Sequence, residues 1–283
     1  MKLLNLIKQY VNWHLKNLVK IYADRLHHRQ KHTFSMLFNL MLTLKGSEDQ
    51  VKYLAGVKQY SIANSKREFI FHNRKQGVHS YKNGLHQRSK EIGEAYMLNE
   101  IDFSDGDCVV DCGANVGDLL LFFEFSNISI DYIGIEPSPK EYLCLKENAK
   151  NYKTFKTGLW DEEGEKVFYI SSDGADSSLI APINFDSKVE IQCTRLDNIQ
   201  LNTPFIKLLK LEAEGAEPEV IEGAKNILKN IEYISADLGP ERGKNNLETY
   251  GPVTSFLYKN NFNLIKVNAE RLSFLFKNNN FKK

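Results

Sequence analysis

The residues best suited to do chemistry form a glycine-containing loop after an apolar run. Val109 and Val110 lead into Asp111, and Gly113 and Gly117 follow shortly before a stretch with helical spacing. Glycine has no Cβ atom, so it allows a sharp turn and lets a ligand approach the backbone. The unpaired N–H groups at the start of the following helix favour a carboxylate or phosphate. We therefore expect a ligand to bind here, at the carboxyl end of a strand.

A second acidic residue, Glu136, ends the next strand-like run. A carboxylate at that place can accept hydrogen bonds from both hydroxyl groups of a ribose, which favours a ligand that contains adenosine. The spacing of Gly113 and Gly117 differs from the G-x-G-x-x-G pattern of dinucleotide-binding loops. An NAD(P)-dependent oxidoreductase on a similar sheet is therefore the less favoured alternative, and a plain strand-to-helix turn would need no ligand at all.

Charged residues alternate with small or apolar ones at Lys210, Glu212 and Glu214. Residues two apart in an extended chain point to the same side, so we expect these three charges to lie together. All seven histidines lie at or before His86, which leaves the rest of the chain without an imidazole base. A hydroxyl acceptor that loses its proton would then need a carboxylate base, for which Glu212, Glu214 and Asp237 are candidates. Lys210 is available to lower the pKa of the hydroxyl.

Two polar loops are candidates to contact an acceptor. One follows Asp237 and contains Glu241 and Arg242, and the other contains Asp176 and Ser177. A solvated turn explains the second loop equally well. The carboxylates could hold Mg²⁺, but they lack the alternating spacing of a defined cation-binding loop, so no metal site is assigned.

The elements that must position these residues begin at about Glu91, where apolar runs of strand length start to alternate with helical patterns. This alternation favours βαβ units in a mainly parallel sheet. The last two runs are joined by only a few residues, so at least one of them must be antiparallel. The stretch 161–197 has no helical pattern and is predicted to be a β-rich insertion with strands at 166–170 and 189–193. The predicted strands of the main sheet are 108–112, 132–135, 154–157, 206–211, 231–236, 262–267 and 272–276, and the predicted helices are 119–125, 139–148, 218–228 and 253–259.

The first 90 residues have a different character. They hold 17 basic and 4 acidic side chains, a formal charge of +13, whereas residues 91–283 hold 20 and 32, a charge of −12. We therefore divide the chain into a basic helical segment with an adaptor, 1–90, and a catalytic domain, 91–283. A second helix is predicted at 34–44 and a short strand at 68–72. The first helix is predicted from one apolar stripe, which consists of Leu4, Ile7, Val11, Leu15, Leu18, Tyr22 and Leu26.

That basic amphipathic helix has two possible roles. Packing against its own domain or in a homo-oligomer is favoured over contact with an anionic membrane surface. The net charge of +1 gives no reason to expect nucleic acid as a partner. The four cysteines form no CxxC pair and no segment is apolar enough to span a bilayer, so we expect a cytoplasmic protein, with peripheral membrane contact as an option. A non-catalytic membrane- or assembly-binding module with a degenerate nucleotide fold is the remaining alternative.

Two stretches together resemble the FkbM-type S-adenosylmethionine-dependent methyltransferases. The family pattern D-x-G-A-N-x-G matches Asp111 to Gly117, and its E-P at the end of the next strand matches Glu136 and Pro137. A second signature, K-[IL]-D-x-E-G-x-E and then a helix with G-A, is similar to residues 210–217 and 223–224. Glu212 stands where the family more often has Asp, which keeps the charge but moves the carboxylate by one methylene. The resemblance covers about residues 91–270.

The resemblance implies a Rossmann-like class I methyltransferase sheet that binds S-adenosylmethionine. Asp111 and the loop would hold the methionine part, and Glu136 the ribose. Trp160 and Asp161 would flank the adenine, although core packing explains Trp160 equally well. The implied activity is O-methylation of a sugar hydroxyl in a glycan, a lipid-linked saccharide or a glycosylated metabolite. The predicted cofactor-binding residues are Asp111, Gly113, Ala114, Asn115, Gly117, Glu136, Pro137, Ser138, Trp160 and Asp161.

Overall fold

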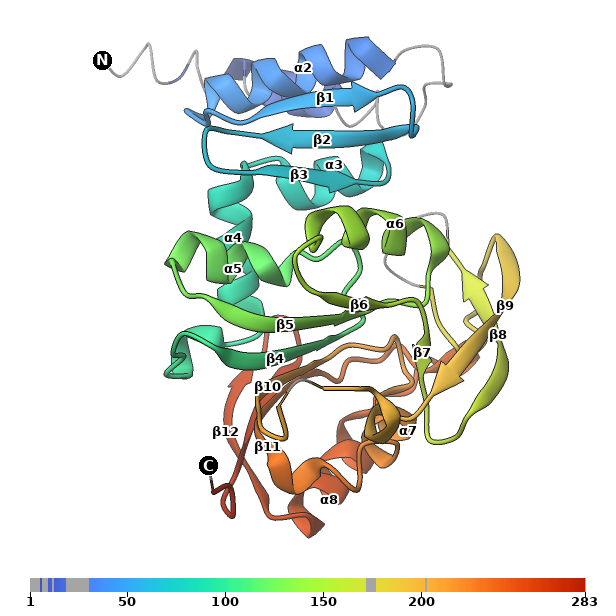
Figure 1. The fold of residues 1–283 in the computed structure, drawn as a ribbon. Coiled ribbons are helices and arrows are strands. Elements are labelled where there is room, and N and C mark those ends of the chain that lie inside the picture. The colour runs from blue at the N-terminus through green and yellow to red at the C-terminus, as the bar shows by residue number, and fades with distance from the viewer. Residues whose placement is uncertain are drawn as a thin grey trace. The chain divides into compact units, whose positions relative to one another are not determined.

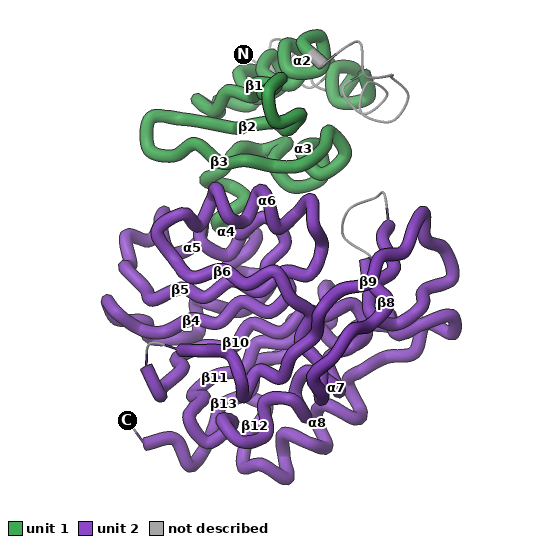
Figure 2. Tube along the Cα trace, turned by 45° about the vertical axis from the view of Figure 1, so that its right-hand side comes forward, with its two compact units in different colours: residues 1–90 green, residues 91–283 purple. Residues whose placement is uncertain are grey.

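The structure is a computed structural model that describes residues 6, 10–11, 13–18, 31–171, 177–201 and 203–282. The chain forms two compact units, Met1–Lys90 and Glu91–Lys283 (Figure 2). The described residues among the first 18 are all helical, and of the predicted apolar stripe Leu15 is buried, whereas Val11 and Leu18 are exposed. Leu4, Ile7, Tyr22 and Leu26 lie outside the described residues. Within the described part of the chain, no helix has the length and apolar character needed to cross a membrane.

Unit 1 is built around a three-stranded antiparallel sheet in the order β1-β2-β3. Aromatic rings form its core: Tyr60 of the central strand lies 5.4 Å from Phe34 and 5.5 Å from Phe71, measured between ring centroids. The predicted second helix and the predicted strand at 68–72 are confirmed, whereas the other two strands were not predicted. The elements are α2 (Lys31–Leu44), β1 (Gln50–Leu54), β2 (Gln59–Ala63), β3 (Glu68–Phe71), α3 (Arg74–Tyr81) and the first part of α4 (Leu85–Ala95).

Unit 2 contains a seven-stranded sheet in the order β12-β13-β11-β10-β4-β5-β6 (Figure 1). The five strands from β11 to β6 are parallel, and β13 is antiparallel to both of its neighbours. All seven strands were predicted, and central strands such as β4 and β10, which are buried on both faces, have nearly continuous apolar sequences. Their bounds are β4 (Asp107–Cys112), β5 (Ile130–Ile135), β6 (Lys153–Phe155), β10 (Ile206–Leu211), β11 (Ile231–Asp237), β12 (Phe262–Asn268) and β13 (Ser273–Asn278).

Helices cover both faces of this sheet (Figure 1). On one face, residues of α7 and α8 pack with Val110 and Leu209, and on the other, residues of α5 and α6 pack with Val109 and Leu208. The alternation of neighbouring residues between two cores follows from the period of two along a strand. The helices are α5 (Leu119–Ser126), α6 (Pro139–Asn148), α7 (Glu217–Glu222) and α8 (Tyr250–Lys259), with 3₁₀ turns η2 (Leu98–Glu100), η3 (Leu196–Asn198), η4 (Leu228–Asn230) and η5 (Gly243–Asn245).

The order of the strands reverses between β4 and β10. The chain continues from β4 to β5 on one side, and from β10 to β11 on the other. Ligands of doubly wound sheets bind at the carboxyl ends of the strands, at such a switch point. This order, with its single antiparallel strand, confirms the predicted Rossmann-like class I methyltransferase sheet.

The predicted β-rich insertion is also present. It forms a separate three-stranded sheet in the order β7-β9-β8. The strands are β7 (Gly158–Leu159), β8 (Gly164–Ile170) and β9 (Ser187–Thr194). Asp176, one of the two predicted acceptor-binding residues of the insertion, lies outside the described residues.

Candidate active site

The loop after β4 turns tightly against the end of β10. Gly113 has a φ of 70°, and a Cβ atom at this position would lie 2.0 Å from the carbonyl oxygen of Glu212. Both the backbone conformation and the lack of space therefore require glycine. The N–H groups of Gly113 and Ala114 donate to the carbonyl oxygen of Ile135 at 3.1 and 3.0 Å. The predicted ligand-binding loop is thus held by the strands on both sides of β4.

Glu136 joins this loop to the start of α6. Its carboxylate accepts hydrogen bonds from the backbone N–H groups of Asn115 and Ser138, each at 2.8 Å. Burial raises the pKa of Glu136 to about 8, against the opposing effect of these two N–H donors. The structure therefore brings the predicted ribose-binding carboxylate and the predicted loop together at the carboxyl edge of the sheet.

Lys210, the fifth residue of β10, lies at the centre of the site. Its buried ammonium group is 2.9 Å from the Glu212 carboxylate and 3.3 Å from the Asp111 carboxylate. It also donates to the carbonyl oxygens of Cys112 and Gly113, at 3.2 and 2.7 Å. Burial alone would lower the pKa of Lys210, but Glu212 and the other negative partners raise it well above its usual range. Lys210 is therefore charged and holds the loop against β10.

Asp111 lies beneath the loop. One carboxylate oxygen accepts a hydrogen bond from the hydroxyl of Tyr132 at 2.7 Å, and the other faces Lys210 without hydrogen-bond geometry. The side chain is almost completely buried, and this burial raises its pKa. In this arrangement Asp111 stabilises Lys210, which in turn holds the loop.

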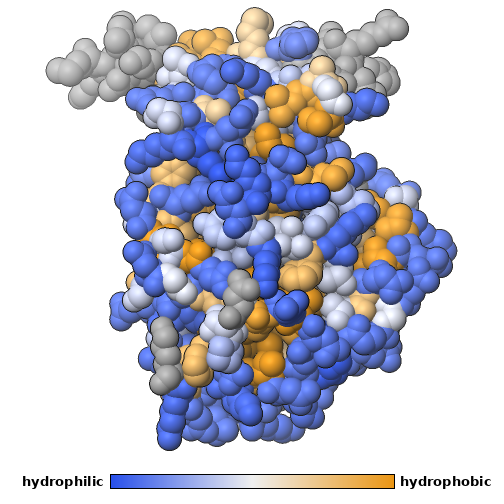
Figure 3. All heavy atoms as spheres, in the orientation of Figure 1, coloured by the Kyte–Doolittle hydropathy of each residue, from blue (hydrophilic) through white to orange (hydrophobic). Residues whose placement is uncertain are grey.

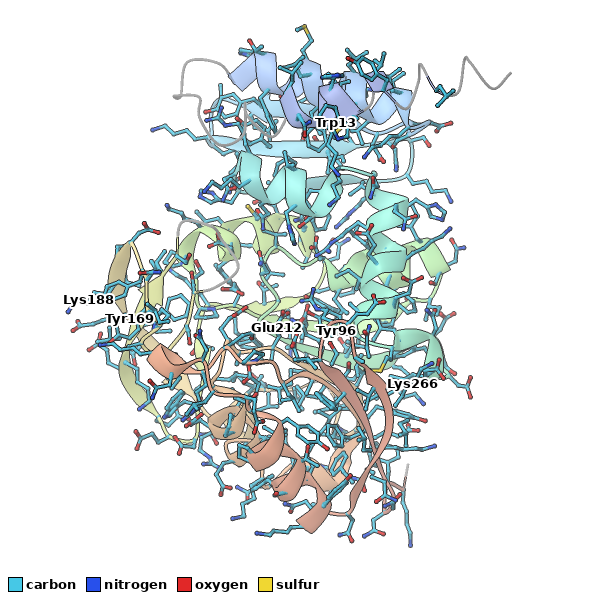
Figure 4. The ribbon with its side chains drawn as sticks, turned by 180° about the vertical axis from the view of Figure 1, so that it is seen from behind. Trp13, Tyr96, Tyr169, Lys188, Glu212 and Lys266 are labelled. Carbon is cyan, nitrogen blue, oxygen red and sulfur yellow. The ribbon has the colours of Figure 1, made fainter. Side chains whose placement is uncertain are left out.

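Glu212 follows directly after β10 and receives three donors. The hydroxyl of Tyr96 donates to it at 2.5 Å, Lys210 lies at 2.9 Å, and the guanidinium of Arg271 lies at 2.9 Å. Figure 4 shows Tyr96 and Glu212 side by side within unit 2. Burial would raise the pKa of Glu212, but the two cations and the hydroxyl lower it to about 2. Glu212 is therefore ionised and fully paired near neutral pH, which makes it a weak base.

Asp237, the last residue of β11, differs from Glu212 in having one engaged oxygen. Arg271 donates to Oδ2 at 3.2 Å, whereas buried Oδ1 has no hydrogen-bond partner among the described residues. The N–H group of Gly239 also approaches the carboxylate and lowers its pKa, but without hydrogen-bond geometry to Oδ1. Burial, and then repulsion by Glu212, nevertheless raise the pKa of Asp237 to about 6.

Glu241 brings a further carboxylate to the same place. A Cβ atom added to Gly239 would lie 3.6 Å from both Asp237 Oδ1 and Glu241 Oε1, so the two carboxylates converge on this glycine. Glu241 is exposed, but the surrounding protein and the charge of Asp237 raise its pKa to about 8. Asp237 and Glu241, like Glu136, are therefore site carboxylates whose protonation changes close to neutral pH.

A family model described as the methyltransferase FkbM domain matches residues 111–264, more than half of the chain. The chain belongs to the FkbM methyltransferase family. It is therefore an S-adenosylmethionine-dependent methyltransferase. No curated protein matches the chain.

Three solved structures with similar folds share little sequence identity with this FkbM methyltransferase. The N-terminal domain of human METTL16 in complex with SAH shares 12% identity at a TM-score of 0.40, over 70% of this chain and 71% of that one. An S-adenosylmethionine-dependent methyltransferase from Aquifex aeolicus shares 10% identity at 0.40, over 67% and 95%. The ribosomal protein L11 methylase of Lactobacillus delbrueckii shares 11% at 0.38, over 68% and 78%. The fold assignment rests on the strand order.

The expected alignment of Glu214 with Lys210 and Glu212 is wrong for this FkbM methyltransferase. The strand ends at Leu211, and Glu214 lies in a turn with a φ of 51°. The alternation of an extended chain therefore applies to Lys210 and Glu212 and stops before Glu214. The turn is held by Glu217, whose buried carboxylate accepts from the N–H groups of residues 213 and 215 at 2.7 and 3.2 Å.

Arg242, predicted to bind the acceptor, has a structural contact in this enzyme. Its guanidinium makes two hydrogen bonds to the carboxylate of Glu219, at 2.6 and 2.7 Å, and a third to the carbonyl oxygen of Gly215. Such a two-pronged pair fixes the side chain and holds the loop after β11 against α7. The structure thus places Arg242 behind the turn that follows β10.

Three further predicted residues lie in or next to the insertion. Trp160 is half-buried, and the ammonium of Lys166 lies 4.9 Å from the centre of its ring. The carbonyl oxygen of Asp161 accepts a hydrogen bond from Arg195. The hydroxyl of Ser177 accepts from the N–H of Ser171 at 3.0 Å. Their adenine- and acceptor-binding roles stay predictions.

Sequence reasoning missed two residues of the site, Tyr96 and Arg271. Arg271 lies in the turn between β12 and β13, and Ser273 pairs with Asp237. The sequence did contain a signal for Arg271. The last strand was predicted to be antiparallel, so the turn before it must lie at the carboxyl edge of the parallel strands, where the site is. Tyr96 directly follows α4 and carries no comparable signal. Among the described residues, no group of three or more His, Cys, Asp and Glu side chains is arranged to hold a metal ion.

Proposed function

We propose that this FkbM methyltransferase methylates a sugar hydroxyl of a glycan, a lipid-linked saccharide or a glycosylated metabolite. The observation that carries the proposal is the pair of carboxylates at the end of β11. A hydroxyl group must lose its proton as it is methylated, and Asp237 Oδ1 is a buried oxygen without a partner among the described residues. The sugar as acceptor rests on the resemblance to the family.

The residues at the carboxyl edge fit the methyl donor. The loop turns tightly at Gly113 against the backbone of Glu212, and the Glu136 carboxylate accepts from the N–H group of Asn115 in the same loop. We assign the methionine part to the loop from Gly113 to Gly117 and the ribose to Glu136. When bound, S-adenosylmethionine supplies a methyl group activated by its sulfonium.

Asp237 would accept the proton of the attacking hydroxyl at Oδ1. Arg271 holds the carboxylate through Oδ2 and thereby fixes the direction in which Oδ1 points. Glu241, which is exposed and converges with Asp237 on Gly239, would then pass the proton to solvent. Lys210 and Glu212 hold the loop and Arg271 in place. Most of the acceleration would then come from alignment of the hydroxyl with the methyl group.

Cofactor binding is tested first by calorimetry with S-adenosylmethionine, its demethylated product and NADH. We expect the first two to bind and NADH not to bind. Glu136→Ala should lose most of the affinity, and Glu241→Gln is the matched control because it also removes a carboxylate from the same edge. Undiminished affinity in Glu136→Ala would refute the ribose assignment.

The acceptor is tested by mass spectrometry of glycans from source cells with and without the gene, followed by linkage analysis. The expected difference is one O-methyl group on a sugar. A methyl group recovered on nitrogen or carbon would contradict the proposal. Asp237→Asn should lower turnover by roughly a hundredfold or more while cofactor affinity stays unchanged.

The cytoplasm remains our proposal for the location, and the four buried cysteines are free thiols, which suits a reducing compartment.

A further inference from the structure

The N-terminal helical segment has an exposed apolar ridge that the sequence stripe did not include. Leu6, Tyr10 and Trp13 are four and three residues apart, which places them on one face of a helix. They are 60%, 66% and 60% exposed. Leu15, on the opposite face, is buried. The helix therefore buries Leu15 and presents the ridge of Leu6, Tyr10 and Trp13 to solvent.

The side chains of the ridge are of the types that lie at a membrane surface. The ring of His14 lies 4.3 Å from that of Tyr10 and 4.7 Å from that of Trp13, so the aromatic rings form one cluster. Tyrosine and tryptophan favour the headgroup region, because each has an apolar body and a polar group. Trp13 is labelled in Figure 4.

The charge of unit 1 indicates that this membrane surface is anionic. Its 17 basic and 4 acidic side chains give +13, whereas unit 2 has −12. Lys16 is exposed on the same helical segment. One of the four acids, Asp49, is buried and accepts hydrogen bonds from Ser47, Asn64 and the Leu85 N–H. Figure 3 shows hydrophobic and strongly hydrophilic side chains mixed at the surface of this unit. An anionic surface complements such a unit.

We propose that the ridge of Leu6, Tyr10 and Trp13 inserts into the headgroup region of an anionic lipid bilayer. The basic side chains of unit 1 attract the lipid phosphates and carboxylates, and the ridge buries its apolar surface at the acyl boundary. Two weak signals, one electrostatic and one apolar, then add to a stable but reversible attachment. The proposal does not depend on the acceptor of the methyl transfer.

Sedimentation of the full-length protein with vesicles tests the proposal. Vesicles of phosphatidylcholine with about 30% phosphatidylserine should bind it, vesicles of phosphatidylcholine alone should bind it at least about tenfold less, and added salt should weaken binding. Replacing both Tyr10 and Trp13 by Ser should lower binding to anionic vesicles by roughly tenfold or more. Tyr258→Ser is the matched control, because Tyr258 is also exposed, at 51%, but lies in unit 2. It should bind like the wild type.

Tryptophan fluorescence provides a second readout that needs no loss of binding. The emission of the wild type should shift to shorter wavelength with anionic vesicles, and Trp13→Phe should abolish the shift. Equal binding of the wild type and the double variant, or equal binding to both kinds of vesicle, would overturn the proposal. A dimer that the double substitution dissociates, in a protein that binds no vesicles, would instead assign the ridge to a second copy of the chain.

Discussion

Arg271 contacts two carboxylates that behave in opposite ways. Glu212 has three donors, and its pKa falls to about 2, whereas Asp237 has one engaged oxygen and a pKa of about 6. The difference follows from the number of charges and hydrogen bonds that favour each ionised form, since burial raises both pKa values. The guanidinium of Arg271 thus contacts Glu212, which stays ionised, and Asp237, which can exchange a proton.

The pKa of Asp237 predicts the pH dependence of catalysis. A base must be deprotonated, so kcat/KM should rise with pH and level off above about 6. Asp237→Asn should abolish this rising limb along with most of the activity, and Glu241→Gln should keep it. The measurement is kcat/KM for methyl transfer between about pH 5 and pH 8. A profile with the same midpoint in Asp237→Asn would move the role of base to another residue.

Glu212 should contribute to stability rather than to proton transfer. Its folded pKa of about 2 lies below the unfolded value of about 4.3, so its contribution is complete above about pH 4.3 and is lost as the pH falls toward 2. Glu212→Gln leaves the cations Lys210 and Arg271 without this partner and should lower the free energy of unfolding at pH 7 by about 3 kcal/mol.

Urea denaturation of the variant checks this value. Glu222→Gln is the control, because its pair with Lys225 lies at the surface and contributes less than about 1 kcal/mol. A similar small loss in both variants would show that the buried cluster around Lys210 can rearrange without cost.

At the scale of elements, the close approach of the β4 loop to the end of β10 determines the geometry of the cofactor side. The loop is fixed by the Gly113 turn, by Lys210 from β10 and by the carbonyl of Ile135 from β5. Non-glycine residues with positive φ also adjoin the site, namely Met97 after Tyr96, Asn115, Glu214 and Leu272 after Arg271. Strained backbone of this kind persists where the surrounding structure holds it in place.

Gly113→Ala tests this arrangement. The new Cβ would lie 2.0 Å from the backbone oxygen of Glu212, so the loop must move away from β10. We expect cofactor affinity to fall by roughly a hundredfold, from a cost of about 3 kcal/mol. Gly106→Ala is a matched control, since Gly106 also has a positive φ, of 84°, but nothing lies within 4 Å of its added Cβ. Calorimetry would show equal affinity in the two variants if space at Gly113 were unimportant.

Much of the fold could be predicted because the signals are local. The runs of β4, β5, β10 and β11 are almost entirely buried and therefore mostly apolar, with charged residues at a few positions such as Asp111 and Lys210. The site was harder to predict. The positive φ of Glu214 and the pairing of Arg242 with Glu219 depend on tertiary packing, which no sequence spacing reveals. Tyr96 reaches Glu212 across 116 residues of sequence, a contact that only the folded chain creates.

At the scale of the whole molecule, the small net charge conceals two units of opposite sign. Unit 2 carries the excess of acidic residues, which includes the buried carboxylates of the site, and unit 1 carries the excess of lysine and arginine. A cationic donor and a neutral acceptor suit the acidic unit, and an anionic surface suits the basic one. The two proposals therefore use different parts of the charge distribution.

The position of Arg271 between β12 and β13 also affects how the enzyme is made. Tyr96 and Arg271 are 175 residues apart in the sequence, yet both contact Glu212. During synthesis on the ribosome, the cofactor loop emerges long before the arginine that holds Asp237 in place. The nascent chain can therefore form the turn at Gly113 early, but Asp237 and Glu212 gain Arg271 as a partner only when the final hairpin closes.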